Sequence, residues 1–157
     1  MTKIKIGGII QNANLAEVCM LGIPDRPGTA AAILGALGKT GINVQFIVQC
    51  VDKSNRDHVA FCVHQEHLDA TLKIMDDVKA KIEAESVSSR PNVAIVSIFG
   101  PDFRERPGIA GAMFEVLAAQ GINILAISTS ISTISCVIDS ERLEDAVAAL
   151  KEAFDLP

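Results

Sequence analysis

Tryptophan and tyrosine are absent from this chain, and aromatic residues make up only 4% of its 157 positions. Apolar residues still account for 49%, so a hydrophobic core must be built from aliphatic side chains. The net charge of −5 and the shortage of aromatic rings disfavour nucleic-acid binding, because phosphates need basic side chains and bases need rings for stacking. The same charge balance disfavours an anionic membrane surface as a partner.

Long apolar runs are missing too, and none approaches the roughly 20 residues needed to span a bilayer. The N-terminus, Met1 to Lys5, lacks the apolar stretch and cleavage site of a signal peptide. We therefore expect a soluble, cytoplasmic protein. In such a protein the four cysteines, none of them in a Cys-x-x-Cys pair, are predicted to be buried free thiols: Cys19, Cys50, Cys62 and Cys136.

Motifs for catalysis are also missing. The chain has no P-loop, no Gly-x-Ser-x-Gly and no His-Glu-x-x-His, so no catalytic residue is predicted. The string Cys62-x-His64-x-x-His67 offers atoms that can bind a metal. It falls where a strand passes into a helix, so the side chains diverge, and no fourth ligand is evident. We expect surface histidines there, with no metal and no cofactor.

What the chain does have is an internal repeat. Arg26-Pro27-Gly28 recurs as Arg106-Pro107-Gly108, and Gly41-Ile42-Asn43 recurs with the same offset as Gly121-Ile122-Asn123. Two copies of one unit, each about half the chain, explain this better than chance.

Each copy shows the same order of elements. Apolar runs and alternation predict strands at 18–23, 42–48, 59–63, 93–99 and 134–138. Proline and glycine open one helix in each copy, and a glycine ends it, at Gly41 and Gly121. The first of these helices has a predicted core stripe at Ala30, Ile33, Leu34 and Leu37. Second helices are predicted from Leu68 to Lys79 and from Leu143 to Phe154.

One asymmetry predicts how the copies are joined. A fourth strand is predicted at 81–87 in the first copy, whereas the second copy ends without one, and a spare strand is predicted at 4–10. The N-terminal strand would complete the sheet of the second copy, which would otherwise keep an unpaired edge. The sequence therefore predicts an α+β protein of two ferredoxin-like βαββαβ domains, antiparallel sheets with helices on one face. The predicted domains are 12–88, and 89–157 together with 1–11.

The predicted binding site is the loop from the first strand into the first helix. The unpaired N–H groups of a helix N-terminus can hold a carboxylate. Gly28 permits close approach of the backbone, and Asp25 offers an acceptor for an ammonium group. Alternatively, Asp25 is only a helix cap and Pro27-Gly28 only a helix start. Recurrence of the pattern in both copies favours a site that holds both the carboxylate and the ammonium group of an amino acid.

Three polar residues are further candidates. Gln49 lies on the polar register of the second strand, and Asn43 and Asn123 follow the two helices. The alternatives are an exposed sheet residue for Gln49 and turn residues for the asparagines.

These stretches together resemble the paired ACT domains that form the regulatory portion of aspartokinases and that some bacteria make separately as a β subunit. The resemblance is carried by residues 23–28, 41–44, 47–49, 127–130, 134–138 and 150–154. It implies binding of threonine or lysine between the first ACT domain and a second one, commonly across a homodimer. It also implies a regulated enzyme, an aspartokinase or another enzyme subunit, as a partner.

The resemblance also implies which residues form the pockets. One side of the effector pocket is assigned to Asp25, Gly28, Ala30 and Gln49, and the facing side to Asn123 and Ile124. A pseudo-symmetric second pocket is assigned to Asn43, Val44, Gly108 and Ala110.

The chain departs from the family pattern in two places. Ile131-Ser132-Thr133 replaces a charged Glu-Ile-Lys/Arg, and residues 100–106 differ from the usual Gly-Met-Arg-Ser-His. The first departure affects coupling to a kinase subunit, and the second affects the ligand of the second pocket. The sequence predicts a non-catalytic, amino-acid-binding regulatory protein. The alternatives are an aspartokinase β subunit acting on a separate catalytic subunit, and a ligand-free adaptor that pairs its edge strands with another protein.

Overall fold

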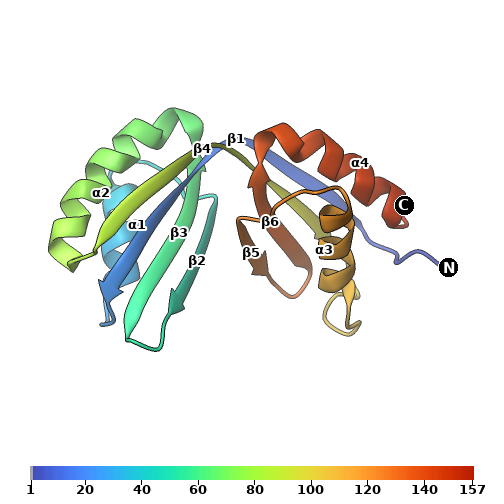
Figure 1. The fold of residues 1–157 in the computed structure, drawn as a ribbon, viewed down its shortest axis with the longest axis horizontal. Helices are drawn as coiled ribbons and strands as arrows, with labels where there is room; N and C mark the ends of the chain where they lie inside the picture. The colour runs from blue at the N-terminus through green and yellow to red at the C-terminus, as the bar shows by residue number, and fades with distance from the viewer. Residues whose placement is uncertain (1) are drawn as a thin grey trace. The chain divides into compact units, whose positions relative to one another are not determined.

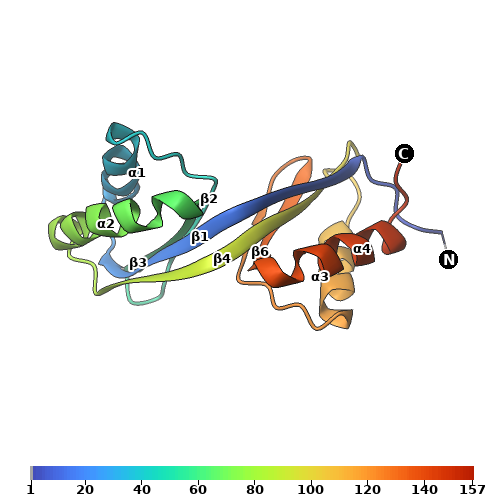
Figure 2. The ribbon, with the colours of Figure 1, turned by 90° about the horizontal axis from the view of Figure 1, so that it is seen from above.

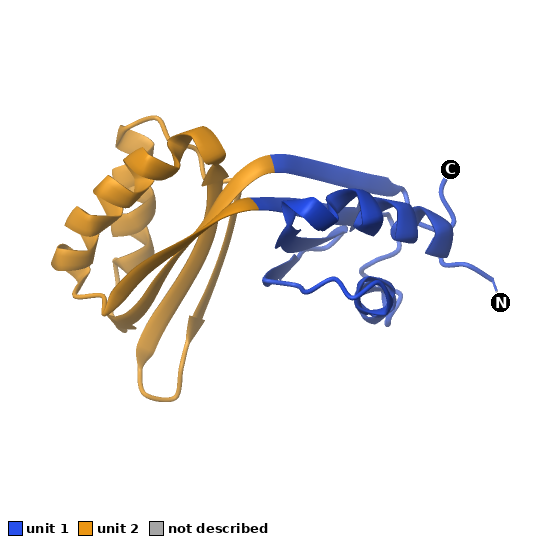
Figure 3. Cartoon of the chain, turned by 45° about the horizontal axis from the view of Figure 1, so that its top comes forward, with its two compact units in different colours: residues 1–13, 93–157 blue, residues 14–92 orange. Residues whose placement is uncertain are grey.

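Six strands and four helices form the described part of the chain (Figure 1). The chain divides into two compact units, and the boundary between them lies inside two long strands. The computed structural model describes residues 2–157. Strands β1 (Gly8–Pro24) and β4 (Ser86–Phe99) are neighbours in the sheet and supply residues to both units (Figure 2). The inserted unit is Asn14–Asn92, and the terminal unit joins the segment up to Ala13 with Val93–Pro157 (Figure 3).

The inserted unit has the strand order β2-β3-β1-β4, with antiparallel pairing of β1 with β3 and of β2 with β3. Its helices lie on one face of these strands (Figure 1). Its remaining elements are α1 (Thr29–Lys39), β2 (Phe46–Val51), β3 (Arg56–His64), a 3-10 turn (Gln65–His67) and α2 (Leu68–Ile82).

The terminal unit repeats this arrangement with the order β1-β4-β6-β5. The start of β1 takes the place that β4 has in the inserted unit. Its other elements are α3 (Ile109–Ala119), β5 (Ala126–Thr129), β6 (Thr133–Asp139), a 3-10 turn (Ser140–Arg142) and α4 (Leu143–Ala153). Two helices over four strands in each unit confirm the predicted α+β, ferredoxin-like fold.

Each unit has its own aliphatic core. In the inserted unit, Val59, Phe61 and Val63 of β3 face Ile33 and Leu37 of α1. The terminal unit buries a corresponding set from β4, β6, α3 and α4, together with Ile6 from the N-terminal segment. Alternation along the strands and the helical repeat place these side chains on the shared face.

Several predicted element bounds are wrong. Of the strand predicted at 4–10, residues 8–10 belong to β1, which also contains the strand predicted at 18–23, whereas residues 4–7 precede β1. Of the strand predicted at 81–87, residues 86 and 87 belong to β4 together with 93–99, whereas residues 81 and 82 lie in α2 and 83–85 connect the two. The polar stretches between the apolar runs still pair with neighbouring strands, so their polarity marks exposure and not a turn. The second strand begins at Phe46, and Leu34, predicted to be in the core, is 38% exposed.

The first helix of each unit ends two residues before the predicted glycine, which follows the C-cap residue in a left-handed conformation. Gly41 and Gly121 have φ angles of 75° and 68°, which side chains with a Cβ rarely adopt. The next N–H then reaches back into the last turn, where Ile42 donates to the Leu37 carbonyl (3.1 Å). Across residues 2–157, no helix combines the length and apolar character needed to cross a membrane.

Candidate functional site

The N-terminus of α1 has no side-chain cap within the described chain. Gly28 occupies the N-cap position with φ 101°, and no side chain accepts from the first-turn N–H groups. Asp25 is exposed, and its own backbone N–H donates to the Asn55 carbonyl (3.0 Å). Asp25 is therefore not the helix cap, and the first turn of α1 keeps the donors that a ligand carboxylate requires.

The loop before α1 is tied to the β2–β3 hairpin. Ile23 pairs with Asp57 and Pro24 with Arg56 in the ladder between β1 and β3. With the bond from Asp25 to Asn55, these pairings bring the loop and the start of β3 to the same end of the sheet.

A carboxylate and an amide meet at this end of the sheet. The Gln49 Nε2 donates to Asp57 Oδ2 over 2.6 Å. Asp57 is only 1% exposed, and its second oxygen, Oδ1, is buried without a hydrogen-bond partner. Gln49 itself is exposed. Sequence reasoning selected Gln49 but missed Asp57.

A signal for Asp57 was present in the sequence. Asp57, Val59, Phe61 and Val63 alternate along β3, and the last three face the core. A carboxylate on a core-facing register is unusual, since burial of a charged group without full pairing is costly. That pattern marks Asp57 as a candidate functional residue.

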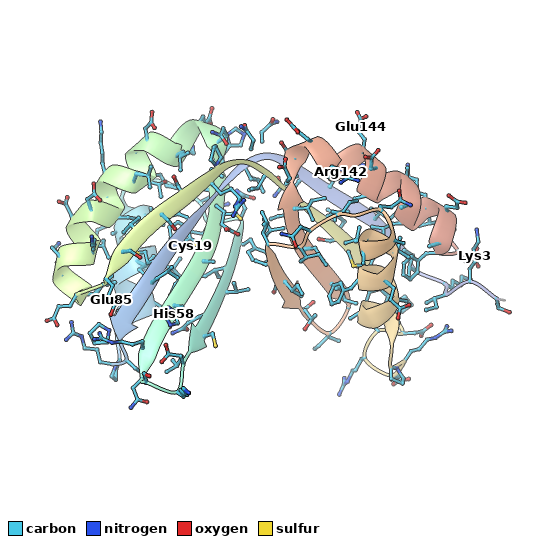
Figure 4. All side chains as sticks on the ribbon, in the orientation of Figure 1. Lys3, Cys19, His58, Glu85, Arg142 and Glu144 are labelled. Atoms are coloured by element: carbon cyan, nitrogen blue, oxygen red, sulfur yellow. The ribbon has the colours of Figure 1, made fainter. Side chains whose placement is uncertain are left out.

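The opposite face of the same strands carries a second polar network. The Gly22 N–H donates to His58 Nδ1 (3.2 Å), so His58 Nε2 carries the proton and donates to Asp52 Oδ2 (2.8 Å). Figure 4 shows the position of His58 in the inserted unit. The His58 hydrogen bond, followed by backbone N–H groups of Arg56 and Ser54, lowers the pKa of Asp52. This network ties the hairpin to β1 where the β1–β3 register is irregular.

Asn123 and Ile124 follow α3 in the terminal unit. Asn123 is exposed, and Ile124 packs against the core. Arg142 donates from Nη2 to the Gln120 carbonyl (2.7 Å) and from Nη1 to the Gly121 carbonyl (3.3 Å). These bonds satisfy carbonyls at the end of α3 and fix the turn that presents Asn123.

Asn43 and Val44 have the corresponding positions in the inserted unit. Asn43 is exposed after Gly41, and Val44 packs against the core. Each asparagine is therefore placed at the surface by an apolar neighbour anchored in its own unit.

Gly108 and Ala110 line a hollow of about 270 Å³ in the terminal unit. Gly108 is the N-cap of α3, with φ 91°, and α3 also begins without a side-chain cap among the described residues. The other residues lining the hollow are Phe103, Arg106, Pro107, Ile109, Thr129, Ser130 and Ile134. Gly108 and Ala110, which the resemblance assigns to the second pocket, thus both line this hollow at the start of α3.

The cysteines and histidines have separate surroundings. All four cysteines are free thiols, but the prediction that all are buried is wrong, since Cys50 is exposed and Cys19 is half-buried. Cys62 is fully buried, whereas His64 and His67 lie at the surface with ring centroids 6.2 Å apart. Among residues 2–157, no group of three or more His, Cys, Asp or Glu side chains is arranged to hold a metal.

Comparison with known proteins places both halves of the chain in one domain family. Residues 18–83 and residues 96–154 each match the sequence profile of the ACT domain. An aspartate kinase of Pseudomonas fluorescens is 41% identical over 151 residues, which cover 96% of this chain. The chain spans only 37% of that relative's length.

Two solved structures are similar over nearly their whole length. The regulatory subunit of aspartate kinase from Thermus thermophilus, in a ligand-free form, is 35% identical with a TM-score of 0.86, covering 96% of this chain and 99% of that one. A chain in a structure of aspartokinase α and β subunits is 34% identical with a TM-score of 0.85, covering 94% and 97%. The similarity extends over the regulatory ACT part and does not include a kinase domain.

Proposed function

Because this chain belongs to the family of aspartate kinase regulatory subunits with tandem ACT domains, we propose that it binds a small amino acid and thereby regulates a separate catalytic subunit. Threonine and lysine are the favoured effectors. The observation that supports this best is the start of α1, where Gly28 leaves the first-turn N–H groups uncapped. The loop before α1 is paired with the start of β3, the strand that carries Asp57 and its bond to Gln49.

Each part of an amino acid has a complementary group in the proposed pocket. The first turn of α1, at Gly28 and Ala30, holds the ligand carboxylate through backbone N–H groups. The exposed Asp25 accepts hydrogen bonds from the ligand ammonium, and Gln49 meets the ligand side chain. Asn123 and Ile124 of a second copy of the chain complete the pocket in a homodimer.

A second pocket of related construction is proposed in the terminal unit. Gly108 and Ala110 already line a hollow there, and Arg106 adds a cationic side chain to it. Asn43 and Val44 from another copy complete this pocket. Its loop differs in sequence from the first, so the two pockets need not bind the same ligand.

Regulation follows from a pocket built by two ACT domains. A ligand that touches both domains favours the arrangement in which both contacts are made. It shifts the equilibrium only by the difference in its affinity between arrangements, and a bound catalytic subunit responds to that shift. We propose the cytoplasm as the place of action, because the subunit must meet its kinase and free amino acids in one compartment.

Two substitutions test the proposed pocket. Asp25→Ala and Asn123→Ala are each expected to weaken amino-acid binding by tenfold or more, since charge-assisted and side-chain hydrogen bonds to the ligand are lost, about 1.5–3 kcal/mol each. Both residues are exposed, so the fold is retained. Calorimetric titration with threonine and with lysine measures the effect. Asp69→Ala, an exposed carboxylate on α2, is the matched control.

An adaptor without a ligand is the second candidate, and one observation favours it. Ile131 is 70% exposed in the turn between β5 and β6, where a charged residue is expected for contact with a kinase. An adaptor would pair with another protein through such apolar surface and would not respond to amino acids. If the Asp25 and Asn123 variants bind amino acids normally, the proposed location of the pocket is wrong. If the unmodified chain binds no amino acid, the adaptor function is favoured.

A further inference from the structure

Burial of the Asp57 carboxylate destabilises the fold. Its carboxylate is 1% exposed and receives one side-chain hydrogen bond, from Gln49, while Oδ1 has no partner. Among the described residues, buried side-chain atoms without partners occur at Glu17, Asp57 and Thr71, and of these Asp57 is the one bonded to a residue of the proposed pocket. Burial of a carboxylate with incomplete pairing lowers stability, so its presence calls for a functional reason.

The Asp57 carboxylate fixes the orientation of the Gln49 amide. A carboxylate accepts hydrogen bonds and donates none, so the contact of 2.6 Å requires the amide nitrogen to face Asp57. The reverse orientation would set the amide oxygen against a carboxylate oxygen, which is repulsive. The Gln49 carbonyl oxygen, Oε1, therefore points away from Asp57. Since Gln49 is exposed, this oxygen is open to a ligand.

We infer that Asp57 is a positioning residue that turns Gln49 into a fixed acceptor, so that the pocket selects amino acids whose side chain donates a hydrogen bond. This inference rests on the proposed function, because it requires the effector to contact Gln49. An unrestrained glutamine accepts or donates equally well and would not distinguish these ligands. Threonine, with a hydroxyl, and lysine, with an ammonium group, both carry the required donor.

The terminal unit lacks this arrangement. Residues 126–138, which contain β5, the turn and β6 up to Ile138, include no Asp or Glu. The last residue of β6, Asp139, pairs with Val93 at the far end of the strand and accepts a hydrogen bond from the Glu141 N–H. No carboxylate therefore lies near the β5–β6 turn to fix an amide there, so selection for a donor side chain is confined to the pocket of the inserted unit.

The test uses pairs of amino acids that share a shape and differ in the donor. Threonine is compared with valine, and lysine with 2-aminoheptanoic acid, by calorimetric titration of the full chain. The unmodified protein is expected to bind either threonine or lysine at least about tenfold more tightly than the analogue that lacks the side-chain donor. The analogue leaves the Gln49 oxygen without a hydrogen bond from the ligand. In Asp57→Asn the ratio is expected to fall to threefold or less, since an asparagine lets the Gln49 amide turn over.

Two further measurements separate positioning from a structural role. A neutral amide is cheaper to bury than a carboxylate, so Asp57→Asn is expected to keep or raise the Tm while the ratio falls. Loss of a purely structural residue would lower the Tm and weaken both ligands equally. Gln49→Met removes the acceptor at an exposed position and should abolish the preference. Val51→Ala, at an exposed position on the same face of β2, adds no hydrogen-bonding group opposite Asp57 and should keep it.

The outcomes distinguish this inference from the function on which it rests. If the unmodified chain binds none of the four amino acids, the proposed effectors are wrong and the inference fails with them. If the chain binds threonine or lysine but Asp57→Asn and Gln49→Met keep the full preference, the proposed function stands and the role of Asp57 is refuted.

Discussion

At the scale of single residues, burial raises the pKa values of two cysteine thiols. Burial raises the pKa of Cys136 from its ordinary value of 9.0 to about 12. Burial, with smaller contributions from Glu17 and Cys19, raises the pKa of Cys62 to about 12. Between these values the folded chain keeps thiol protons that the unfolded chain releases. The contribution of each buried thiol to the free energy of unfolding is therefore fully present below the ordinary pKa. It declines as the pH rises toward the pKa of the folded state.

Unfolding at alkaline pH tests this assignment. From about pH 8 to about pH 10, each buried thiol is expected to remove about 1 kcal/mol from the free energy of unfolding. Cys136→Ala should show a decline smaller by that amount in urea titrations at the two pH values. Cys50→Ala changes an exposed thiol and should keep the full decline. Equal declines in both variants would contradict a raised pKa at Cys136.

The site was partly predictable from its residue types. Gly28 and Gln49 were selected because a recurring Pro-Gly start and a polar residue in an apolar strand are local features. Asp57 was missed because the strand was predicted to begin at Val59, whereas pairing with β1 extends β3 back to Arg56 and places Asp57 on the alternation that faces the core. The role of Arg142 likewise depends on a contact with α3 from a distant part of the chain.

At the scale of elements, α1 shows two opposite uses of glycine. Gly28 has φ 101°, while Gly35 lies inside the helix, and a Cβ at either position meets open space. The two positions therefore have the same room for a side chain and differ in backbone conformation, which is left-handed at Gly28 and helical at Gly35.

Alanine substitution at the two positions should act in opposite directions. Gly28→Ala is expected to lower the free energy of unfolding by about 1–2 kcal/mol, because the left-handed conformation is strained for a residue with a Cβ. Gly35→Ala should raise it by about 0.5–1 kcal/mol through helix propensity. Chemical denaturation measures both. A stabilising Gly28→Ala would show that the start of α1 is not held in the left-handed conformation.

Element types were predicted better than element bounds. The helices follow from proline, glycine and apolar stripes, which are local signals. The continuity of β1 and β4 across polar stretches such as Gln11 to Asn14 depends on partner strands. Local polarity suggested breaks there, and tertiary pairing overrode it.

At the scale of the whole molecule, the core of the terminal unit includes Ile6, which is distant in sequence from the other buried residues of that core. Ile6 is 2% exposed and packs with residues of β4, β6, α3 and α4. Its segment is also held by backbone bonds, with the Ile6 N–H donating to the Asp155 carbonyl (2.9 Å). The N-terminal segment therefore stabilises a unit whose other residues begin at Val93.

Ile6→Ala should destabilise one unit selectively. Loss of a buried isoleucine costs about 2–5 kcal/mol, and the cost is expected in peptides of residues 93–157. Hydrogen exchange read by mass spectrometry resolves the two units, and peptides within 14–92 should change little. Ile10→Ala, at a side chain that is 50% exposed, is the matched control. Equal loss of protection in both units would contradict an independent core in the terminal unit.

The central claim is that the chain senses an amino acid, and a thermal-shift screen of the full chain against the twenty amino acids tests it most directly. A ligand present at 100 times its dissociation constant stabilises the folded state by about 2.7 kcal/mol, which shifts the Tm by several degrees. The account predicts such a shift with threonine or lysine and little with valine. No shift with any amino acid at millimolar concentration would contradict it.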